Sequence, residues 1–337
     1  MKQKICVIKA DGIGDAVLAS PFFRELRRLY PKAEITAFLS PLGAPVLSEP
    51  GLIDKVIVFD PLWLKYKKTF FLKRCISALS LVLKINTIKP HILIGLRWQD
   101  RLSSLVLSLS NAKDKFGYDV RGMGWGINHK FSAPVSGTPE YLKHLAALKQ
   151  MNKSAKLKPR FGVFVSRGAE KRVSLLTARY KKTGYTVIHP VSGHPSKDWD
   201  RSKYRELAVK LARKTGVFVI GAAADRGIER ITGAKAHNLA GKLSIEETAA
   251  LIKNAKFFIG NDSFGGHMSA VFGVKSLTLF SGTAPAAEWA PYGKKAVVLV
   301  SQAECAPCGK TNCDKETHKC MDFTVKEVYE RVVKVLK

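Results

Sequence analysis

Residues 257–273 combine the side chains that bind an anion at the start of a helix. The apolar run at 257–259 is typical of a buried strand, and Asp262 and Ser263 are N-cap residues whose oxygens accept the first helical amides. Gly265 and Gly266 carry no Cβ, so a ligand can approach their backbone closely. Because a helix N-terminus presents free N–H groups and partial positive charge, we predict a phosphate-binding turn here. An ordinary capped helix without a ligand is the alternative.

A carboxylate stands at the start of another predicted helix. Asp15 follows the strand-like run at 5–8 and the two glycines Gly12 and Gly14. We expect the helix dipole to keep Asp15 ionised, and such a carboxylate can act as a general base toward a hydroxyl. A structural helix-start aspartate is the alternative. No third glycine follows at dinucleotide-binding spacing, which disfavours an NAD-dependent enzyme.

A polar loop follows the predicted strand at 185–189. It holds Ser192, Gly193 and Lys197, which are residue types that bind phosphate. A solvated loop with one exposed lysine is the alternative. In an open parallel sheet, ligands bind at the carboxyl ends of the strands, so we expect this loop and the two helix starts to line a cleft between two halves.

Four cysteines occur close together near the end of the chain. Cys305, Cys308, Cys313 and Cys320 have the spacing C-x2-C-x4-C-x6-C. Four such thiolates can hold Zn²⁺ or an iron–sulfur cluster, although the second C-x2-C pair of a zinc ribbon is missing. Structural thiols without a metal are the alternative.

The elements that position these residues repeat an α/β pattern twice. Short apolar runs alternate with helical patterns, which predicts mostly parallel sheets. We place a first domain at 1–165, a second at 166–322 and a C-terminal helix at 323–337. Pro21 is expected to kink or restart the first helix, with Ser20 as its cap.

The formal net charge of +29 predicts an anionic partner: nucleic acid, an acidic membrane surface or a phosphorylated substrate. The basic residues are dispersed and form no nucleic-acid-binding motif. Residues 63–68 form a basic, aromatic flank before an apolar helix at 70–85, which predicts either membrane contact or a plain surface segment. No apolar run reaches the ~20 residues of a membrane span, and the N-terminus has no signal-peptide pattern. We therefore expect a cytoplasmic protein with mostly reduced or metal-bound cysteines.

Taken in order, these segments resemble glycosyltransferase family 9, the heptosyltransferases of lipopolysaccharide core assembly. The similarity extends over nearly the whole chain and includes the cysteine segment. The segments that carry it are residues 8–21, 189–190, 196–199, 238–242, 260–267 and 305–321.

The resemblance implies a GT-B fold, with two Rossmann-like domains facing each other across a cleft: an N-terminal acceptor domain and a C-terminal donor domain. It implies inverting transfer of a sugar, usually heptose, from an ADP-sugar to a hydroxyl of an anionic glycolipid. No cofactor is required for that chemistry, and zinc at the cysteines would be structural. The enzyme would contact the anionic inner membrane peripherally and bind no nucleic acid. A basic nucleic-acid-binding protein and a non-catalytic nucleotide-sugar-binding protein on the same fold are the alternatives.

The resemblance also implies roles for individual residues. Asp15 matches the family's proposed base, and Lys197 matches the lysine that contacts the donor diphosphate. Ser192 and Gly193 lie where the family has phosphate-contacting groups. The donor-binding turn is matched by Asp262, Ser263 and His267. Phe264 departs from the family, which usually has glycine directly after the Asp-Ser pair; we expect it to alter the diphosphate turn or narrow the sugar site.

Overall fold

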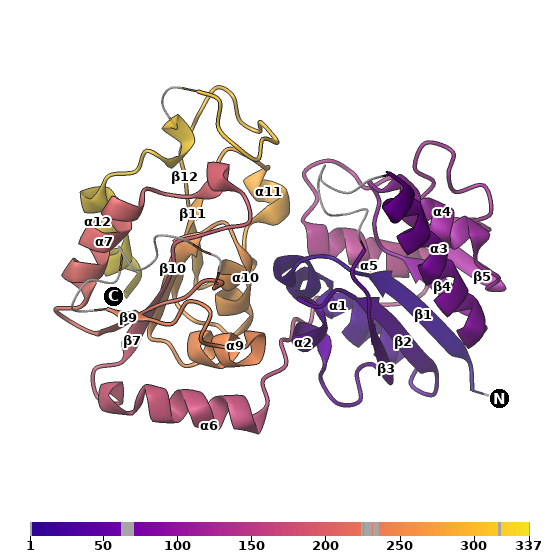
Figure 1. Cartoon of the computed structure of the whole chain (residues 1–337), viewed down its shortest axis with the longest axis horizontal. Helices are drawn as coiled ribbons and strands as arrows, with labels where there is room; N and C mark the ends of the chain where they lie inside the picture. Colours follow the sequence, from indigo (N-terminus) through magenta and orange to yellow (C-terminus); the bar gives the residue numbers. More distant parts are fainter. Residues whose placement is uncertain are drawn as a thin grey trace. The chain divides into compact units, whose positions relative to one another are not determined.

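The computed structural model describes residues 2–61, 71–223, 225, 231, 236–315 and 318–336. The chain divides into two compact units, Met1–Gly162 and Val163–Lys337 (Figure 1). The boundary expected from sequence was after residue 165. The flank at 63–68 lies outside the described residues.

The first unit contains a six-stranded parallel sheet in the order β3-β2-β1-β4-β5-β6. Its strands are β1 (Lys4–Lys9), β2 (Glu34–Leu39), β3 (Lys55–Val58), β4 (Ile92–Gly95), β5 (Asp114–Gly117) and β6 (His129–Lys130). Its helices are α1 (Ile13–Leu29), α2 (Ala44–Leu47), α3 (Phe71–Ile88), α4 (Arg101–Leu109) and α5 (Glu140–Met151).

The second unit contains another six-stranded parallel sheet, in the order β12-β11-β10-β7-β8-β9. Its strands are β7 (Tyr185–His189), β8 (Gly216–Val219), β9 (His237–Asn238), β10 (Phe257–Asn261), β11 (Ser276–Phe280) and β12 (Ala296–Val300). Its helices are α6 (Arg167–Leu176), α7 (Arg201–Leu211), α9 (Ile245–Lys253), α10 (Phe264–Val271), α11 (Ala286–Trp289) and α12 (Val325–Leu336).

Both sheets have the same topology, because numbering the strands within each unit gives the doubly wound order 3-2-1-4-5-6. The strand order reverses between β1 and β4 in the first unit and between β7 and β10 in the second. Loops leaving two such strands turn to opposite faces of the sheet and leave a crevice between them. The residues that follow these four strands are therefore placed to meet a ligand.

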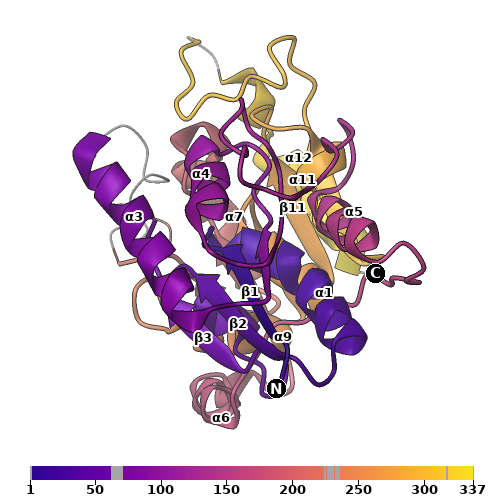
Figure 2. The same ribbon diagram turned by 90° about the vertical axis from the view of Figure 1, so that its right-hand side faces the viewer.

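Helices cover both faces of each sheet, so the central strands are buried, whereas the edge strands β3 and β6 are partly or fully exposed. In the first unit α3 and α4 lie on one face and α1 and α5 on the other (Figure 2). Cys6 and Ile8 of β1 pack with Leu81 and Ile85 of α3. In the second unit α7 and α12 share one face, and α9 and α10 pack together on the other (Figure 1).

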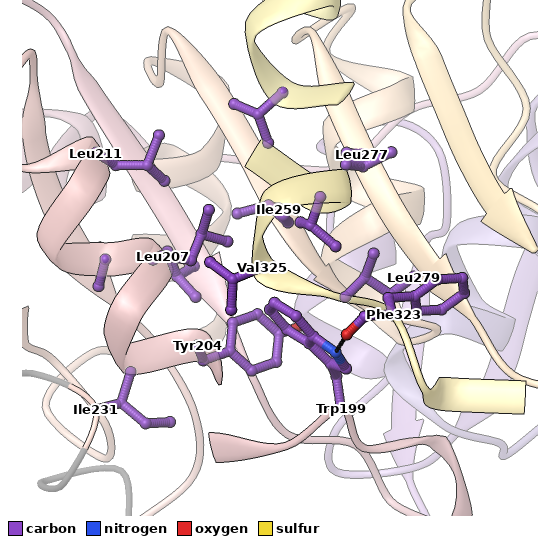
Figure 3. Packing of buried hydrophobic residues seen from close by; sticks show 14 of the residues in the cluster. Trp199, Tyr204, Leu207, Leu211, Ile231, Ile259, Leu277, Leu279, Phe323 and Val325 are labelled. Atoms are coloured by element: carbon purple, nitrogen blue, oxygen red, sulfur yellow. Dashed lines mark hydrogen bonds between the residues drawn. The ribbon is translucent and has the colours of Figure 1, made fainter. Parts of the chain in front are cut away.

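The core of the second unit includes the C-terminal helix. Val325, Val328 and Val332 of α12 are buried against α7 and the sheet (Figure 3). The indole of Trp199, which is 1% exposed, donates a hydrogen bond to the Phe323 carbonyl at 2.9 Å. The helix predicted at 323–337 thus belongs to this unit, and it anchors the loop that follows β7.

Helix α1 runs continuously through Pro21, so the helix does not restart there. Ser20 is not a cap, contrary to expectation. Proline has no N–H to donate to the carbonyl four residues earlier, which is that of Val17. The Ser20 hydroxyl donates to this same carbonyl at 2.7 Å and also accepts from the N–H of Gly162. The serine thereby satisfies the acceptor that the proline leaves unpaired.

Within the described parts of the chain, no helix is sufficiently long and apolar to cross a bilayer.

Candidate active site

In the first unit, the loop after β1 carries Asp15 into the first turn of α1. Gly12 is the N-cap residue, and the Asp15 side chain is 32% exposed. Burial raises the pKa of Asp15, an effect that the Lys9 ammonium 3.9 Å away partly offsets. The direction of this shift is opposite to the one that the helix dipole alone would give, and ionisation of Asp15 stays a prediction. A carboxylate with a raised pKa binds a transferred proton more strongly than an ordinary one, which suits a general base.

Asp15 adjoins a buried group of charged side chains. The Lys9 ammonium, 3% exposed at the end of β1, lies 2.8 Å from a carboxylate oxygen of Asp11. Arg97, just beyond β4, forms an ion pair with the other oxygen of Asp11. Residues at the ends of β1 and β4, where the strand order reverses, thus form ion pairs with one another. We did not identify Lys9, Asp11 and Arg97 from sequence; their positions directly after strand ends were the available signal.

A second layer of charge comes from α5. The Glu140 carboxylate lies 3.2 Å from the Lys143 ammonium, and both side chains are buried. Lys143 also lies over the Trp98 ring, 4.6 Å from its centroid. Glu140 raises the pKa of Asp15, whereas it supports the charge of Lys9. Glu140, which is far from Asp15 in sequence, thus adds to the larger effect of burial on the pKa of Asp15.

In the second unit, the loops after β7 and β10 meet at the reversal of strand order. Lys197 lies in the short 3₁₀ turn Pro195–Lys197, and its ammonium is 2.6 Å from a carboxylate oxygen of Asp262. Lys197 is 21% exposed and Asp262 5% exposed. Two residues predicted from separate motifs are therefore in direct contact.

Asn261, at the end of β10, holds the loop that carries Lys197. Its side-chain amide donates to the Pro190 carbonyl at 2.8 Å and to Asp198 at 3.2 Å. Its carbonyl oxygen accepts from the Trp199 N–H and the Tyr204 hydroxyl. The loop is therefore held in place before any ligand binds.

Ser192 has a hydrogen-bonding role within that loop. Its hydroxyl lies 2.8 Å from a carboxylate oxygen of Asp198 and 2.7 Å from the His194 carbonyl, and it accepts from the His194 N–H. No Cβ clash would arise at Gly193, because nothing lies within 4 Å of the position that its Cβ would occupy. The space beside Gly193 therefore holds no other part of the protein and leaves room for a ligand next to the loop backbone.

Ser263 is the N-cap residue of α10, but its side chain makes no capping hydrogen bond. Its hydroxyl instead lies 2.8 Å from Nδ1 of His189, and Asp262 is engaged with Lys197. The prediction that these two side chains cap the helix is therefore wrong. The consequence favours ligand binding, because the side chains that would compete for the first amides are held elsewhere.

Phe264 packs on the same histidine, with ring centroids 4.7 Å apart and an interplanar angle of 56°. His189 is 4% exposed, and burial lowers its pKa to about 4. The imidazole is therefore neutral near pH 7.

The two glycines of α10 are required by packing within the chain. A Cβ on Gly265 would meet the Phe258 ring at 2.5 Å, and one on Gly266 would meet Oγ1 of Thr278 at 2.7 Å. The missing side chains are thus explained by packing inside the chain, and the predicted approach of a ligand to the backbone of these glycines stays a prediction. They allow α10 to lie close to the sheet, which places its N-terminus at the end of β10.

His267 lies one turn along α10, is 5% exposed, and its Nδ1 has no hydrogen-bond partner. Burial lowers its pKa to about 4, while Asp262 raises the pKa and Lys197 lowers it. Because the charges of Asp262 and Lys197 both act on its ring, His267 lies near this pair.

The cysteine segment braces the turn that carries Lys197. Ser196 donates from its N–H to the Thr311 carbonyl at 3.0 Å and from its hydroxyl to the Lys310 carbonyl at 2.5 Å. His318 Nε2 lies 2.8 Å from the Ser196 carbonyl. This contact was not foreseen from sequence.

Cys305, Cys308, Cys313 and Cys320 all line one cavity of about 250 Å³. Their thiols are free. Across the described residues, no three His, Cys, Asp or Glu side chains are grouped so as to hold a metal ion. The suggestion of a structural zinc is therefore unsupported.

A model of glycosyltransferase family 9 (heptosyltransferase) matches residues 85–319. This chain belongs to glycosyltransferase family 9. Lipopolysaccharide heptosyltransferase 3 of Escherichia coli is 28% identical over 286 residues, which cover 80% of each chain.

Solved structures show the same fold. A family 9 glycosyltransferase from Veillonella parvula matches 100% of this chain and 98% of its own, with a TM-score of 0.85 and 18% identity. The E. coli heptosyltransferase WaaC, solved with ADP-2-deoxy-2-fluoro heptose, matches 98% of this chain and 99% of its own, with a TM-score of 0.72 and 15% identity. The protein is a glycosyltransferase with the two doubly wound sheets of the GT-B fold, as predicted.

Proposed function

We propose that this glycosyltransferase transfers heptose from ADP-heptose to a hydroxyl of the lipopolysaccharide core or a related anionic glycolipid, with inversion at the anomeric carbon. Family membership and the names of its relatives support the sugar and the acceptor class. The observation that carries the proposal is the Lys197–Asp262 pair at the N-terminus of α10, where strand order reverses in the second unit. It combines a cation and helix amides at one place, as a diphosphate requires.

The second unit would bind the donor. Lys197 and the amides at the start of α10 would hold the diphosphate, while the Ser192–Gly193 bend would approach it through backbone groups. The diphosphate gains negative charge as its bond to the sugar breaks. Donors placed in advance stabilise that charge, and removing one costs about 3 kcal/mol.

The first unit would supply the base. Asp15 would take the proton of the acceptor hydroxyl, and the oxygen would attack the anomeric carbon opposite the diphosphate. The new C–O bond forms as the bond to ADP breaks, and the proton remains on Asp15. Lys9 and Asp11 would position this carboxylate, because Lys9 contacts both. In this scheme Lys197 and the helix amides stabilise the leaving group, and no cofactor takes part.

Calorimetric titration of the wild-type protein with ADP, ADP-heptose, UDP and a UDP-sugar tests the donor class. We expect selective binding of ADP and ADP-heptose. Incubation with ADP-heptose and a core glycolipid should then release ADP and add one heptose, detected by mass spectrometry. Binding without transfer to any core glycolipid would favour the non-catalytic alternative. Binding of DNA with steep salt dependence, and of no nucleotide, would favour the nucleic-acid alternative.

A further inference from the structure

Helix α3 exposes a continuous line of large apolar side chains. Leu72, Ile76, Leu79 and Leu83 are between 55% and 69% exposed, and Phe71 at the start of the helix is 76% exposed. We call the first four the apolar stripe. Single exposed apolar residues are ordinary on a protein surface, whereas a continuous patch marks a surface that binds something.

Helical geometry explains why the stripe is continuous. Its members follow the spacing i, i+4, i+7, i+11, which places them on one side of the helix over a length of ~16 Å. The opposite side packs into the core through Ala78, Leu81, Val82 and Ile85. Hence α3 is apolar on two faces, and only one of them is needed for folding. In Figure 2, α3 lies on the side of its sheet remote from α1 and α5.

The charges of α3 identify the partner. The helix carries Lys73, Arg74 and Lys84 and has no Asp or Glu, within a chain of net charge +29. Lys73 and Lys84 are exposed, and both fall ~100° around the helix from the apolar stripe, on the same flank. Two copies of this surface would bring like charges together, which disfavours self-association. An anionic lipid surface accepts both the apolar stripe and the basic flank.

We propose that the apolar stripe and basic flank of α3 form the surface by which this enzyme docks on an anionic bilayer. The helix would lie in the plane of the interface, with the apolar stripe entering the boundary between headgroups and acyl chains. This proposal rests on the proposed function in one respect: a membrane-embedded glycolipid acceptor gives the docking its purpose. The surface would place the acceptor-binding unit at the membrane without a spanning segment.

Flotation of the full chain with vesicles tests the docking. We expect binding to vesicles of phosphatidylethanolamine and phosphatidylglycerol, and much weaker binding to vesicles of phosphatidylcholine alone. The double variant Ile76→Ser, Leu79→Ser should bind the anionic vesicles at least about tenfold more weakly, since it removes apolar area that lipid would cover. The variant Lys73→Gln, Lys84→Gln should lose the preference for anionic lipid.

The matched control is Leu175→Ser, Leu176→Ser on α6, which also removes two exposed apolar side chains and should bind as wild type does. All variants should unfold at the wild-type temperature, because none of these positions is buried. Equal loss in the α6 variant, or unchanged binding in the α3 apolar variant, would overturn the proposal. A concentration-dependent dimer that Ile76→Ser abolishes, seen by analytical ultracentrifugation, would also overturn it and assign the stripe to a second copy.

A comparison of two acceptors separates this proposal from the proposed function. The α3 apolar variant should match the wild-type rate with a deacylated core oligosaccharide in solution. With the glycolipid embedded in vesicles, it should be at least several-fold slower. Vesicle binding by a wild-type protein that transfers no sugar would refute the function and leave the docking surface standing. Sugar transfer by a wild-type protein that does not bind vesicles would refute the docking surface and leave the proposed function standing.

Discussion

The ammonium of Lys197 lies 2.6 Å from a carboxylate oxygen of Asp262, although the two residues come from loops after different strands. Asp262 is 5% exposed, so removing the lysine would leave a buried carboxylate without its ion pair. A donor diphosphate at the start of α10 would bring a second negative group to the same lysine. Lys197 therefore stabilises the folded protein through Asp262 when no ligand is bound, and it would contribute to donor affinity through the diphosphate.

Replacing Lys197 by alanine should weaken ADP binding about 10- to 100-fold, because hydrogen bonds to charged groups contribute about 1.5–3 kcal/mol. The variant should also be less stable, since Asp262 is left unpaired. Calorimetry with ADP and urea unfolding measure the two effects. Lys210→Ala, at a half-buried position on α7 where the lysine pairs with Glu206, is the control. An unchanged dissociation constant for ADP would remove Lys197 from the donor site.

Asp15→Asn should lower kcat by about 10²–10⁴-fold, the usual contribution of a general base, while ADP affinity stays within about twofold. The amide keeps the shape of the carboxylate and loses its basicity. Burial raises the pKa of Asp15, so the acid limb of kcat/KM should lie above that of an ordinary aspartate. Steady-state kinetics across pH measure both, with the exposed Asp322→Asn as control. An equal loss of donor affinity would refute the role as base.

The hydrogen bonds that the cysteine segment makes to Ser196 should influence donor binding, although they are not themselves contacts with the proposed donor. His318→Ala removes the contact to the Ser196 carbonyl, and a single hydrogen bond contributes about 1 kcal/mol, or about fivefold in affinity. We expect the KM for the donor to rise by this factor with kcat nearly unchanged. His129→Ala in the first unit is the control. A fall in kcat at constant KM would show that His318 acts in some other way.

Gly265 and Gly193 should respond oppositely to alanine. Gly265→Ala places a Cβ against the Phe258 ring and should destabilise the protein by about 1–3 kcal/mol. Gly193→Ala meets no neighbouring atom, so stability should be kept, while ADP binding weakens if the donor approaches there. Urea unfolding and ADP calorimetry on both variants measure the contrast. A stable Gly265→Ala variant would contradict the packing role.

The buried histidines should make stability fall as the solution is acidified. His189 and His267 have pKa values of about 4 in the folded chain, below the ordinary 6.5. Since the unfolded chain binds protons first, their contribution is complete above pH 6.5 and is lost as pH falls toward 4. Each can add a slope of up to about 1.4 kcal/mol per pH unit.

Urea unfolding between pH 7.5 and 5 tests this, with His189→Gln as the comparison. The variant should show a smaller slope, because one titrating group is missing. The NMR signals of the His189 ring should not shift between pH 8 and 5.5. A His189 titration midpoint near 6.5 would contradict the neutral, buried state.

Local patterns were sufficient for much of the architecture. Ser244 and Glu247 form a capping box at the start of α9, and the valines of α12 face the core. Helix periodicity and capping depend on residues within one or two turns, so a sequence displays them directly. Strands at the centre of a parallel sheet are buried on both faces, and the run before Asn261 shows this as unbroken apolar residues.

The site depended on contacts that sequence does not display. Lys9, Asp11 and Arg97 meet only because β1 and β4 are neighbours, and Ser263 bonds to His189 rather than to its own helix. The Ser263 hydroxyl does not cap its own helix because it bonds instead to His189, 74 positions away in the sequence.

The order of the residues was enough to predict the α/β class, the family motifs and the residue types at each strand end. Which of these side chains pair, what their pKa values become and why α10 needs its glycines became visible in the folded chain. The physical reason is that charge pairing, burial and close packing depend on distances in space, which sheet order sets across more than 60 positions of chain.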